Sequence, residues 1–281
     1  MYMWRKRAAK EWLTRYRDEL EGRLGSRLAI IEEAGKARAV VEVCCENRPE
    51  AGQLDREFGG IIEKLPANWL HEFAKRSRVS PLRIGSRLIV SPTSGGPRSI
   101  VIPAEAAFGT GEHATTAMCL RLLERVTRNR PAGWSLLDAG TGSGILAIAG
   151  ARFGAKRIVA IDNDPTAAAV AERNAKKNGA GRIEFRTGDI LKQRFRGKFD
   201  IITANLYSEL LIAAVPGWSR LLPDHGSLIL SGVLRSQERA VVTALRRHKL
   251  AVQETKRRGK WIALLCGGSP LASLSRRRMT A

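Results

Sequence analysis

A glycine-rich segment in the middle of the chain carries the clearest chemical signal. Residues 138–144 read DAGTGSG and lie between a predicted strand and a predicted helix. At the carboxyl end of a strand, such a turn lets a ligand approach the backbone closely. The dinucleotide pattern GxGxxG would need glycine where Ile145 stands, and no Gly-Lys-Ser/Thr follows, which excludes a Walker loop. The spacing of Gly140, Gly142 and Gly144 instead fits the compact loop that supports the methionine end of S-adenosylmethionine.

Three carboxylates follow this loop at the ends of the next two predicted strands. Asp162 ends the strand RIVAID, 22 residues after Gly140, where a carboxylate can accept hydrogen bonds from ribose hydroxyls. Asp164 precedes Pro165 and is better placed to cap the next helix, whereas Asp189 lies where an adenine amine could bind. Each acid alone is equally consistent with a helix cap or a solvated turn. Together they indicate a cofactor that contains adenosine.

A fourth predicted strand, FDIITAN, ends at Asn205 and is followed by LYSELL. The side-chain amide of Asn205, at its tip, can donate and accept hydrogen bonds at a methyl-transfer site, or it can cap the helix that begins near Ser208. The segment resembles the NPPY signature of amine and amide methyltransferases, but Leu206 alone replaces both prolines of that signature. This difference argues against specificity for a nucleobase or a glutamine.

A second glycine-rich loop, residues 106–116, precedes a predicted helix. Its backbone N–H groups are free to bind an anion, and Thr115 or Thr116 can cap the helix or contact a ligand carboxylate. His113 could act as a general base, but we interpret it as a structural loop residue. No second metal ligand is near it in the sequence, and we assign neither a metal site nor a catalytic acid or base.

The elements that position these residues alternate regularly from Trp134 onward. Strands and helices follow one another and end in two successive strands near the C-terminus, which predicts an antiparallel hairpin at the sheet edge. This alternation requires a mostly parallel sheet covered on both faces. The predicted fold class is therefore α/β, a Rossmann-like sheet of seven strands, with a small N-terminal α+β domain. The predicted strands are 135–140, 157–162, 182–189, 199–205, 227–232, 251–257 and 261–266.

The N-terminal part has a different pattern. Residues 4–24 have helical periodicity, and two strands, a short helix and a further strand are predicted after them, up to residue 65. In the connector a helix leads into a strand and then a turn-rich stretch. The predicted domains are an α+β domain (1–65), a connector (66–98), the α/β domain (99–268) and a basic tail (269–281).

The composition narrows the possible partners. The 281 residues include 48 Lys and Arg against 27 Asp and Glu, a net charge of +21, and 44% are hydrophobic, which excludes a disordered polycation. Apolar runs are too short to span a membrane. A basic surface attracts RNA, a ribonucleoprotein or an anionic membrane, although a proteome of generally high pI is an equally good explanation. The four cysteines fit buried, reduced thiols, so we expect a cytoplasmic protein.

The motifs together resemble one family. AFGTGEHATT from residue 107, LLDAGTGSG from residue 136 and ANLYSELL from residue 204 are similar to the PrmA family, whose members methylate protein eleven of the large ribosomal subunit. The resemblance covers roughly residues 69–266. It implies S-adenosylmethionine as cofactor and methyl transfer to amines, either a lysine side chain or an N-terminal amine, of a ribosomal protein. The cofactor contacts it implies are Thr116, Gly140, Gly142, Asp162 and Asn205.

The family's N-terminal domain is ferredoxin-like and recruits the substrate. Since residues 4–24 are predicted as helix, this chain is expected to lack the first strand of that domain. In that family this domain selects the substrate, so the choice of methyl acceptor depends on it. A methyltransferase of the same fold acting on another protein, RNA or a small molecule, and a noncatalytic binding module, are the competing hypotheses.

Overall fold

The structure is a computed structural model that describes residues 1–24, 27–31, 37–65, 81–93, 95–103 and 113–268. The chain divides into two compact units, Met1–Ser77 and Arg78–Ala281. The helix predicted in the connector, most of the loop 106–116 and the basic tail lie outside the described residues. The predicted domain boundaries stay predictions.

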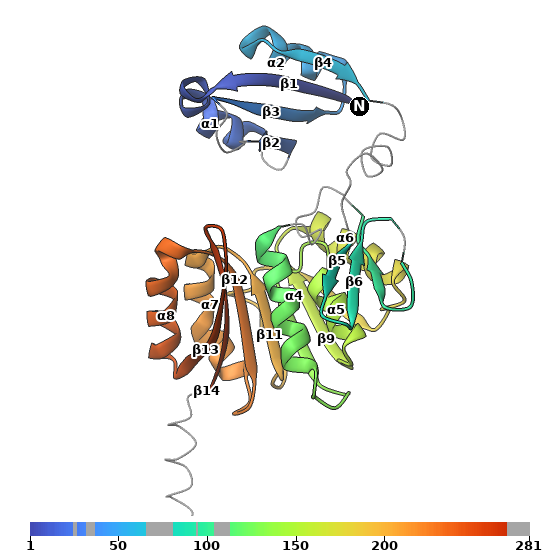
Figure 1. The fold of residues 1–281 in the computed structure, drawn as a ribbon, viewed down its shortest axis with the longest axis vertical. Coiled ribbons are helices and arrows are strands. Elements are labelled where there is room, and N and C mark those ends of the chain that lie inside the picture. Colours follow the sequence, from blue (N-terminus) through green and yellow to red (C-terminus); the bar gives the residue numbers. More distant parts are fainter. Residues whose placement is uncertain (25–26, 32–36, 66–80, 94, 104–112, 269–281) are drawn as a thin grey trace, which may run out of the picture. The chain divides into compact units, whose positions relative to one another are not determined.

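The larger unit is built on a seven-stranded sheet with the order β10-β9-β8-β11-β12-β14-β13 (Figure 1). The pairs from β10 to β12 are parallel, and β14 pairs antiparallel with both β12 and β13. The predicted fold class and the antiparallel hairpin at the sheet edge are confirmed. The strands are β8 (Ser135–Ala139), β9 (Arg157–Asp162), β10 (Ile183–Thr187), β11 (Ile201–Asn205), β12 (Ser227–Leu234), β13 (Leu250–Arg258) and β14 (Trp261–Gly268).

Helices cover both faces of this sheet, as a parallel sheet requires. Along β9, Ile158 and Ala160 pack into the core under α4 and α5, whereas Val159 and Ile161 pack into the core under α7 and α8. This alternation explains why the strand is apolar throughout. The helices and the 3-10 turn are α4 (Ala114–Thr127), α5 (Ile145–Arg152), α6 (Pro165–Lys177), α7 (Ser208–Leu221), η2 (Arg235–Gln237) and α8 (Glu238–Arg247).

A three-stranded sheet packs against α4 and fixes its position. It consists of β5 (Leu82–Ile84), β6 (Leu88–Ser91) and β7 (Ser99–Val101), whose apolar side chains join the core of α4.

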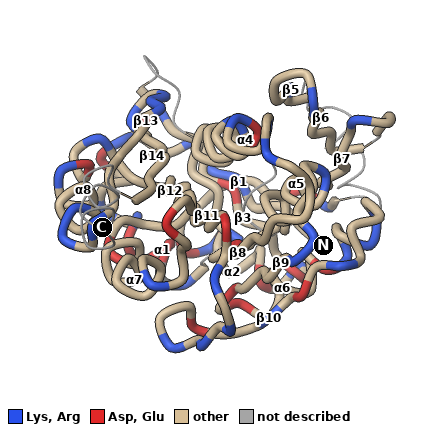
Figure 2. The backbone as a smooth tube through the Cα atoms, turned by 90° about the horizontal axis from the view of Figure 1, so that it is seen from below, with Lys and Arg blue, Asp and Glu red and all other residues tan. Residues whose placement is uncertain are grey.

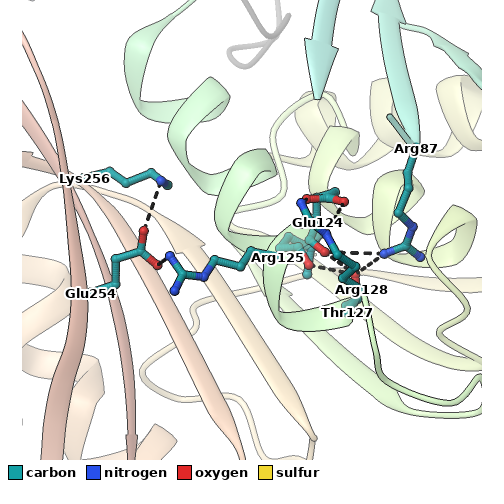
Figure 3. Close-up of polar contacts among 8 residues, drawn as sticks. Arg87, Glu124, Arg125, Thr127, Arg128, Glu254 and Lys256 are labelled. Carbon is teal, nitrogen blue, oxygen red and sulfur yellow. Dashed lines mark hydrogen bonds and ion pairs between the residues drawn. The ribbon is translucent and has the colours of Figure 1, made fainter. Parts of the chain in front are cut away.

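Figure 3 shows the polar contacts at the C-terminal turn of α4. The Arg87 guanidinium lies 3.1 Å from Thr127 Oγ1, and the buried Glu124 pairs with Arg128 at 2.8 Å. Arg125 pairs with Glu254 of β13 at 2.6 Å. These contacts hold the C-terminal end of α4 between the small sheet and the large one, at the end of the helix opposite Thr116.

The N-terminal unit is a four-stranded antiparallel sheet with the order β2-β3-β1-β4 and two helices. Its elements are β1 (Tyr2–Ala9), α1 (Lys10–Leu24), β2 (Leu28–Ile31), β3 (Arg38–Cys45), α2 (Arg48–Phe58) and β4 (Ile61–Lys64). The side chain of Asn47 caps α2 by accepting a hydrogen bond from the Glu50 N–H at 3.0 Å.

The prediction of one helix over residues 4–24 is wrong for its first third. Residues 2–9 form β1, the central strand that pairs with both β3 and β4, so the expected absence of a first strand is also wrong. Trp4 and Ala8 are both buried. Because they are four positions apart, their spacing satisfies a strand period of two as well as a helical turn. The long-range pairing with β3 decides between the two.

The four cysteines are free thiols, and three of them are buried. Burial raises the pKa of Cys119 and Cys266 to about 12, so both are protonated at pH 7. Among the helices that the structure describes, none is both long and apolar enough to cross a bilayer.

Candidate functional site

The glycine loop is a tight turn between β8 and α5. Gly140, Gly142 and Gly144 have φ values of +70°, +53° and +82°, which only glycine adopts without strain. The Gly140 N–H donates to the carbonyl of Ile161 on β9 at 2.9 Å, and the Gly144 N–H donates to Thr141 O at 2.8 Å. The loop therefore lies at the carboxyl edge of the parallel sheet, as predicted.

Asp138, on β8 just before the glycine loop, stabilises the loop through hydrogen bonds. Its carboxylate is fully buried and accepts hydrogen bonds from the hydroxyls of Thr141 and Thr203, each at 2.7 Å. Burial raises the pKa of this carboxyl to about 6, while the two hydroxyls act in the opposite direction. Asp138 is not among the residues predicted for the site: its bond from Thr141 is local, but its second partner, Thr203, is 65 residues away on β11.

Asp162 contacts the same loop from the end of β9. Its Oδ2 accepts a hydrogen bond from the Gly142 N–H at 2.9 Å, and its Oδ1 accepts one from the Asp164 N–H at 3.1 Å. A carboxylate has about four acceptor positions, so each oxygen retains one for a ligand hydroxyl. Asp164 is the N-cap of α6 and accepts from the Thr166 N–H at 2.8 Å, which confirms its predicted structural role.

Asp189 has a structural role that the sequence left open. It accepts a hydrogen bond from the Leu191 N–H at 2.9 Å and pairs with Lys192 at 3.5 Å, so it stabilises the turn after β10. The neighbouring Gly188 N–H donates to Asp162 O at 2.8 Å, which keeps this turn beside the end of β9. The predicted contact of Asp189 with an adenine amine stays a prediction.

Asn205 and Thr116 meet although they are 89 residues apart. Asn205 Nδ2 donates to Thr116 Oγ1 at 3.2 Å, which joins the tip of β11 to the first turn of α4. In the described part of the chain, Asn205 Oδ1 is buried and has no hydrogen-bond partner. The alternative that Asn205 caps a helix is wrong, because Tyr207 occupies the N-cap position of α7.

Leu206 connects Asn205 to the glycine loop. A Cβ built on Gly140 would lie 2.3 Å from Leu206 Cδ2, and one built on Gly232 of β12 would lie 2.3 Å from Leu206 O. Gly232 has a φ of +86° and sits at a register shift between β12 and β14. Gly232 is not among the residues predicted for the site, although a glycine inside a strand often marks a bulge or a close backbone approach.

Substitution of Gly232 with alanine is expected to destabilise the protein by about 2–4 kcal/mol, since the new Cβ meets backbone that cannot move without displacing Asn205. The control is Gly259→Ala, where φ is +58° but nothing lies within 4 Å of the new Cβ. That variant should lose only about 1 kcal/mol. Denaturant unfolding measures both, and equal losses would show that the Leu206 contact does not matter.

His113 is the N-cap residue of α4. Its Nδ1 accepts a hydrogen bond from the Thr115 N–H at 3.5 Å, and its ring packs edge-on against Trp261 with centroids 5.2 Å apart. Burial, and secondarily the charge of Lys260, lower the pKa of His113, so the ring is neutral at pH 7. The geometry agrees with the structural interpretation.

Replacing His113 with alanine should therefore cost about 1 kcal/mol of stability at pH 7.5 and leave methyl transfer within a few-fold. A lowered pKa means that the native state binds fewer protons, so the capping contribution is present above pH ~6.5 and is lost as pH falls below it. Thermal unfolding from pH 5 to 8 should show the gap to wild type closing at low pH. His225→Ala, in an exposed loop, is the control. Loss of methyl transfer in a stable His113→Ala variant would instead indicate general-base catalysis.

The five predicted cofactor residues thus converge on the carboxyl edge of β8, β9 and β11. Gly140 touches Leu206, Gly142 binds Asp162, and Thr116 binds Asn205. Two features fit an adenosine-containing cofactor: a glycine turn that brings bare backbone to the sheet edge, and a carboxylate with acceptor positions to spare. A third feature, the unpartnered Oδ1 of Asn205, fits a ligand that brings a hydrogen-bond donor.

The sheet order, the glycine loop after β8 and the acid ending β9 define the fold of class I S-adenosylmethionine-dependent methyltransferases. A solved structure described as ribosomal protein L11 methylase from Lactobacillus delbrueckii subsp. bulgaricus superposes with a TM-score of 0.61 at 30% identity, covering 67% of this chain and 98% of that one. The family model for ribosomal protein L11 methyltransferase (PrmA) matches residues 24–267. The chain belongs to this family.

Curated relatives carry the same description. A ribosomal protein L11 methyltransferase of Pelotomaculum thermopropionicum is 40% identical over 204 residues, which cover 70% of this chain and 64% of that protein. One from Heliobacterium modesticaldum is 36% identical over 246 residues, covering 82% of this chain and 77% of that protein. The predicted family is therefore confirmed, and with it the predicted cofactor.

Proposed function

We propose that this protein transfers methyl groups from S-adenosylmethionine to amines of ribosomal protein L11, on lysine side chains or the N-terminus. The relatives are named for that substrate. The observation that carries the proposal is Asn205, whose Oδ1 is buried without a partner among the described residues while its Nδ2 is held by Thr116. A buried acceptor of this kind calls for a donor, and an amine N–H supplies one.

S-adenosylmethionine supplies a sulfonium methyl that is already electrophilic. The chain's own residues therefore have to bind the cofactor, orient it relative to the acceptor amine and exclude water. Gly140 and Gly142 would support the cofactor's methionine end and Asp162 its ribose. Thr116 lies in the first turn of α4, where the helix dipole favours an anionic carboxylate.

The acceptor amine must be neutral to react. A lysine of pKa ~10.4 costs about 4.6 kcal/mol to deprotonate at pH 7, and a basic, partly dry cleft lowers that cost. Asn205 Oδ1 would accept the amine N–H and so orient the nitrogen lone pair. We assign no catalytic acid or base.

Labelled S-adenosylmethionine and a ribosomal fraction test the proposal. If protease treatment removes the labelled product and nuclease treatment does not, the result would support methyl transfer to protein. Label removed by nuclease would instead favour an RNA methyltransferase of the same fold, and label on small molecules a third substrate class. Absence of transfer to any component would indicate a noncatalytic binding module.

We also propose that the basic surface contacts RNA around the acceptor, in the cytoplasm where ribosomes assemble. A chain of charge +21 is repelled by an isolated basic protein but attracted to one embedded in RNA. The rate of transfer to ribosomal particles should fall at least tenfold between 50 and 200 mM salt, by the counterion-release relation for several phosphate contacts. A rate independent of salt would contradict this electrostatic role.

A further inference from the structure

The C-terminal part of the larger unit concentrates positive charge. Residues 234–260 contain nine Lys and Arg against two Glu. Four of these cations lie on α8 or the turn after it, and we call them the α8 basic face: Arg239, Arg246, Arg247 and Lys249. All four are exposed, and Figure 2 shows the basic positions along this helix.

The carboxylates around this face are already engaged. Glu238 pairs with Arg257 at 2.7 Å, and Glu254 pairs with Lys256 at 3.0 Å and with Arg125. On the neighbouring helix α7, Glu209 accepts a hydrogen bond from Gln237 Nε2 at 3.3 Å. Among the described residues, no ion pair neutralises the four cations of the α8 basic face, so its positive potential is directed to solvent.

Folding stability does not explain two of these cations. Arg239 lies in the first turn of α8, where a positive charge opposes the helix dipole. Lys249 has a φ of +59°, a left-handed conformation that glycine or asparagine adopts more readily. Arg246 and Arg247, in contrast, lie in the last turn, where cations favour the helix. Residues that break local rules in this way point to a role in binding.

The shape of the surface beside α8 identifies the ligand chemistry. A groove of about 540 Å³ runs between α7 and α8, with Arg239 and Arg247 at two positions along it. The two residues are two helical turns apart, about 12 Å. The hydroxyl of Ser236 lines the same groove and can donate to a phosphate oxygen, whereas the Thr243 hydroxyl already donates to the carbonyl of Arg239 at 2.8 Å. None of its lining residues is aromatic, so it offers no stacking platform for bases.

We infer that the α8 basic face binds the phosphodiester backbone of RNA without reading its sequence. The inference rests on the RNA contact proposed above and says where on the chain that contact lies. It concerns the edge of the sheet at β13, a different part of the fold from the carboxyl edge of β8 and β9 that holds the cofactor residues.

The test compares two charge-matched variants of the full chain. In the first, the four residues of the α8 basic face are changed to Gln. The control changes four exposed cations near β10, at the opposite edge of the sheet, to Gln: Lys177, Arg182, Arg196 and Lys198. Binding to a fluorescein-labelled 20-nucleotide poly(U) RNA is measured by anisotropy from 50 to 300 mM salt, and thermal unfolding confirms that both variants fold.

The α8 variant should bind at least about tenfold more weakly, with the slope of log K against log salt reduced by about 2–3, whereas the control stays within about threefold. Equal weakening in both variants, or none in either, would overturn the α8 site alone. Failure of the wild-type chain to bind the RNA would overturn the RNA contact as well. Methyl transfer to isolated ribosomal protein L11 should be unchanged, which separates this inference from the catalytic proposal. Binding to phosphatidylserine vesicles that depends on the same residues while RNA binding does not would also overturn it.

Discussion

The Asp162→Ala variant is expected to bind S-adenosylmethionine at least 100-fold more weakly than the wild type. Hydrogen bonds to a charged acceptor contribute about 1.5–3 kcal/mol each, so the loss of two ribose contacts corresponds to roughly that factor or more. The same substitution removes the acceptor of the Gly142 N–H and loosens the glycine loop. Isothermal titration calorimetry on the folded variant measures the change in Kd. The Asp162→Asn variant keeps one acceptor oxygen, so its Kd should lie between those of the wild type and of Asp162→Ala.

The matched control is Asp164→Ala, two residues away. Asp164 caps α6 through the Thr166 N–H, so its loss should lower stability by about 1 kcal/mol but leave the cofactor Kd within about twofold. The two variants therefore distinguish an effect on cofactor affinity from an effect on folding stability. If both variants bound S-adenosylmethionine as tightly as the wild type does, the ribose role of Asp162 would be wrong.

The Asn205→Ala variant should show the second large effect, on turnover rather than on cofactor affinity. Without Oδ1 the acceptor amine loses its partner, and misplacement of a reacting atom by about 1 Å can lower the rate about 100-fold. We expect kcat to fall by about that factor while the Kd for S-adenosylmethionine changes less than tenfold. Single-turnover transfer to ribosomal protein L11, at saturating cofactor, measures this difference.

Ser208→Ala is the control for Asn205. Ser208 is also buried near the start of α7, but its hydroxyl donates to Gln237 Oε1 at 2.8 Å and takes no part in the site. Its loss should lower stability by about 1 kcal/mol and leave kcat within a few-fold. An Asn205→Ala variant with wild-type turnover would remove the observation on which the proposed acceptor chemistry rests.

The sequence predicted the parts of the site that depend on local chemistry. The glycines of the loop, the acid at the end of β9 and the cap at Asp164 follow from turn geometry and strand ends, so their spacing is informative. Asn205 was found because it stands at a strand tip, although its partner could not be known. Thr116 came from the family resemblance, and only the fold brings its hydroxyl to Asn205.

Long-range packing decided the features that the sequence left out. Asp138 links the glycine loop to β11 only because Thr203 lies opposite it, in addition to the local bond from Thr141. A glycine is needed at position 232 because the Leu206 backbone passes close to it. The sequence predicts a helix where residues 4–9 of β1 lie, because Trp4 and Ala8 fit both periods. In each case, the deciding contact lies with a residue distant in sequence.

Mass spectrometry of ribosomal protein L11 after incubation with the purified chain and S-adenosylmethionine tests the central claim most directly. The account predicts mass increments of one or more methyl groups that map to lysine side chains or to the N-terminal amine, and that are absent with Asp162→Ala. An unmodified protein, with methylation instead of RNA or of a small molecule in the same extract, would contradict it.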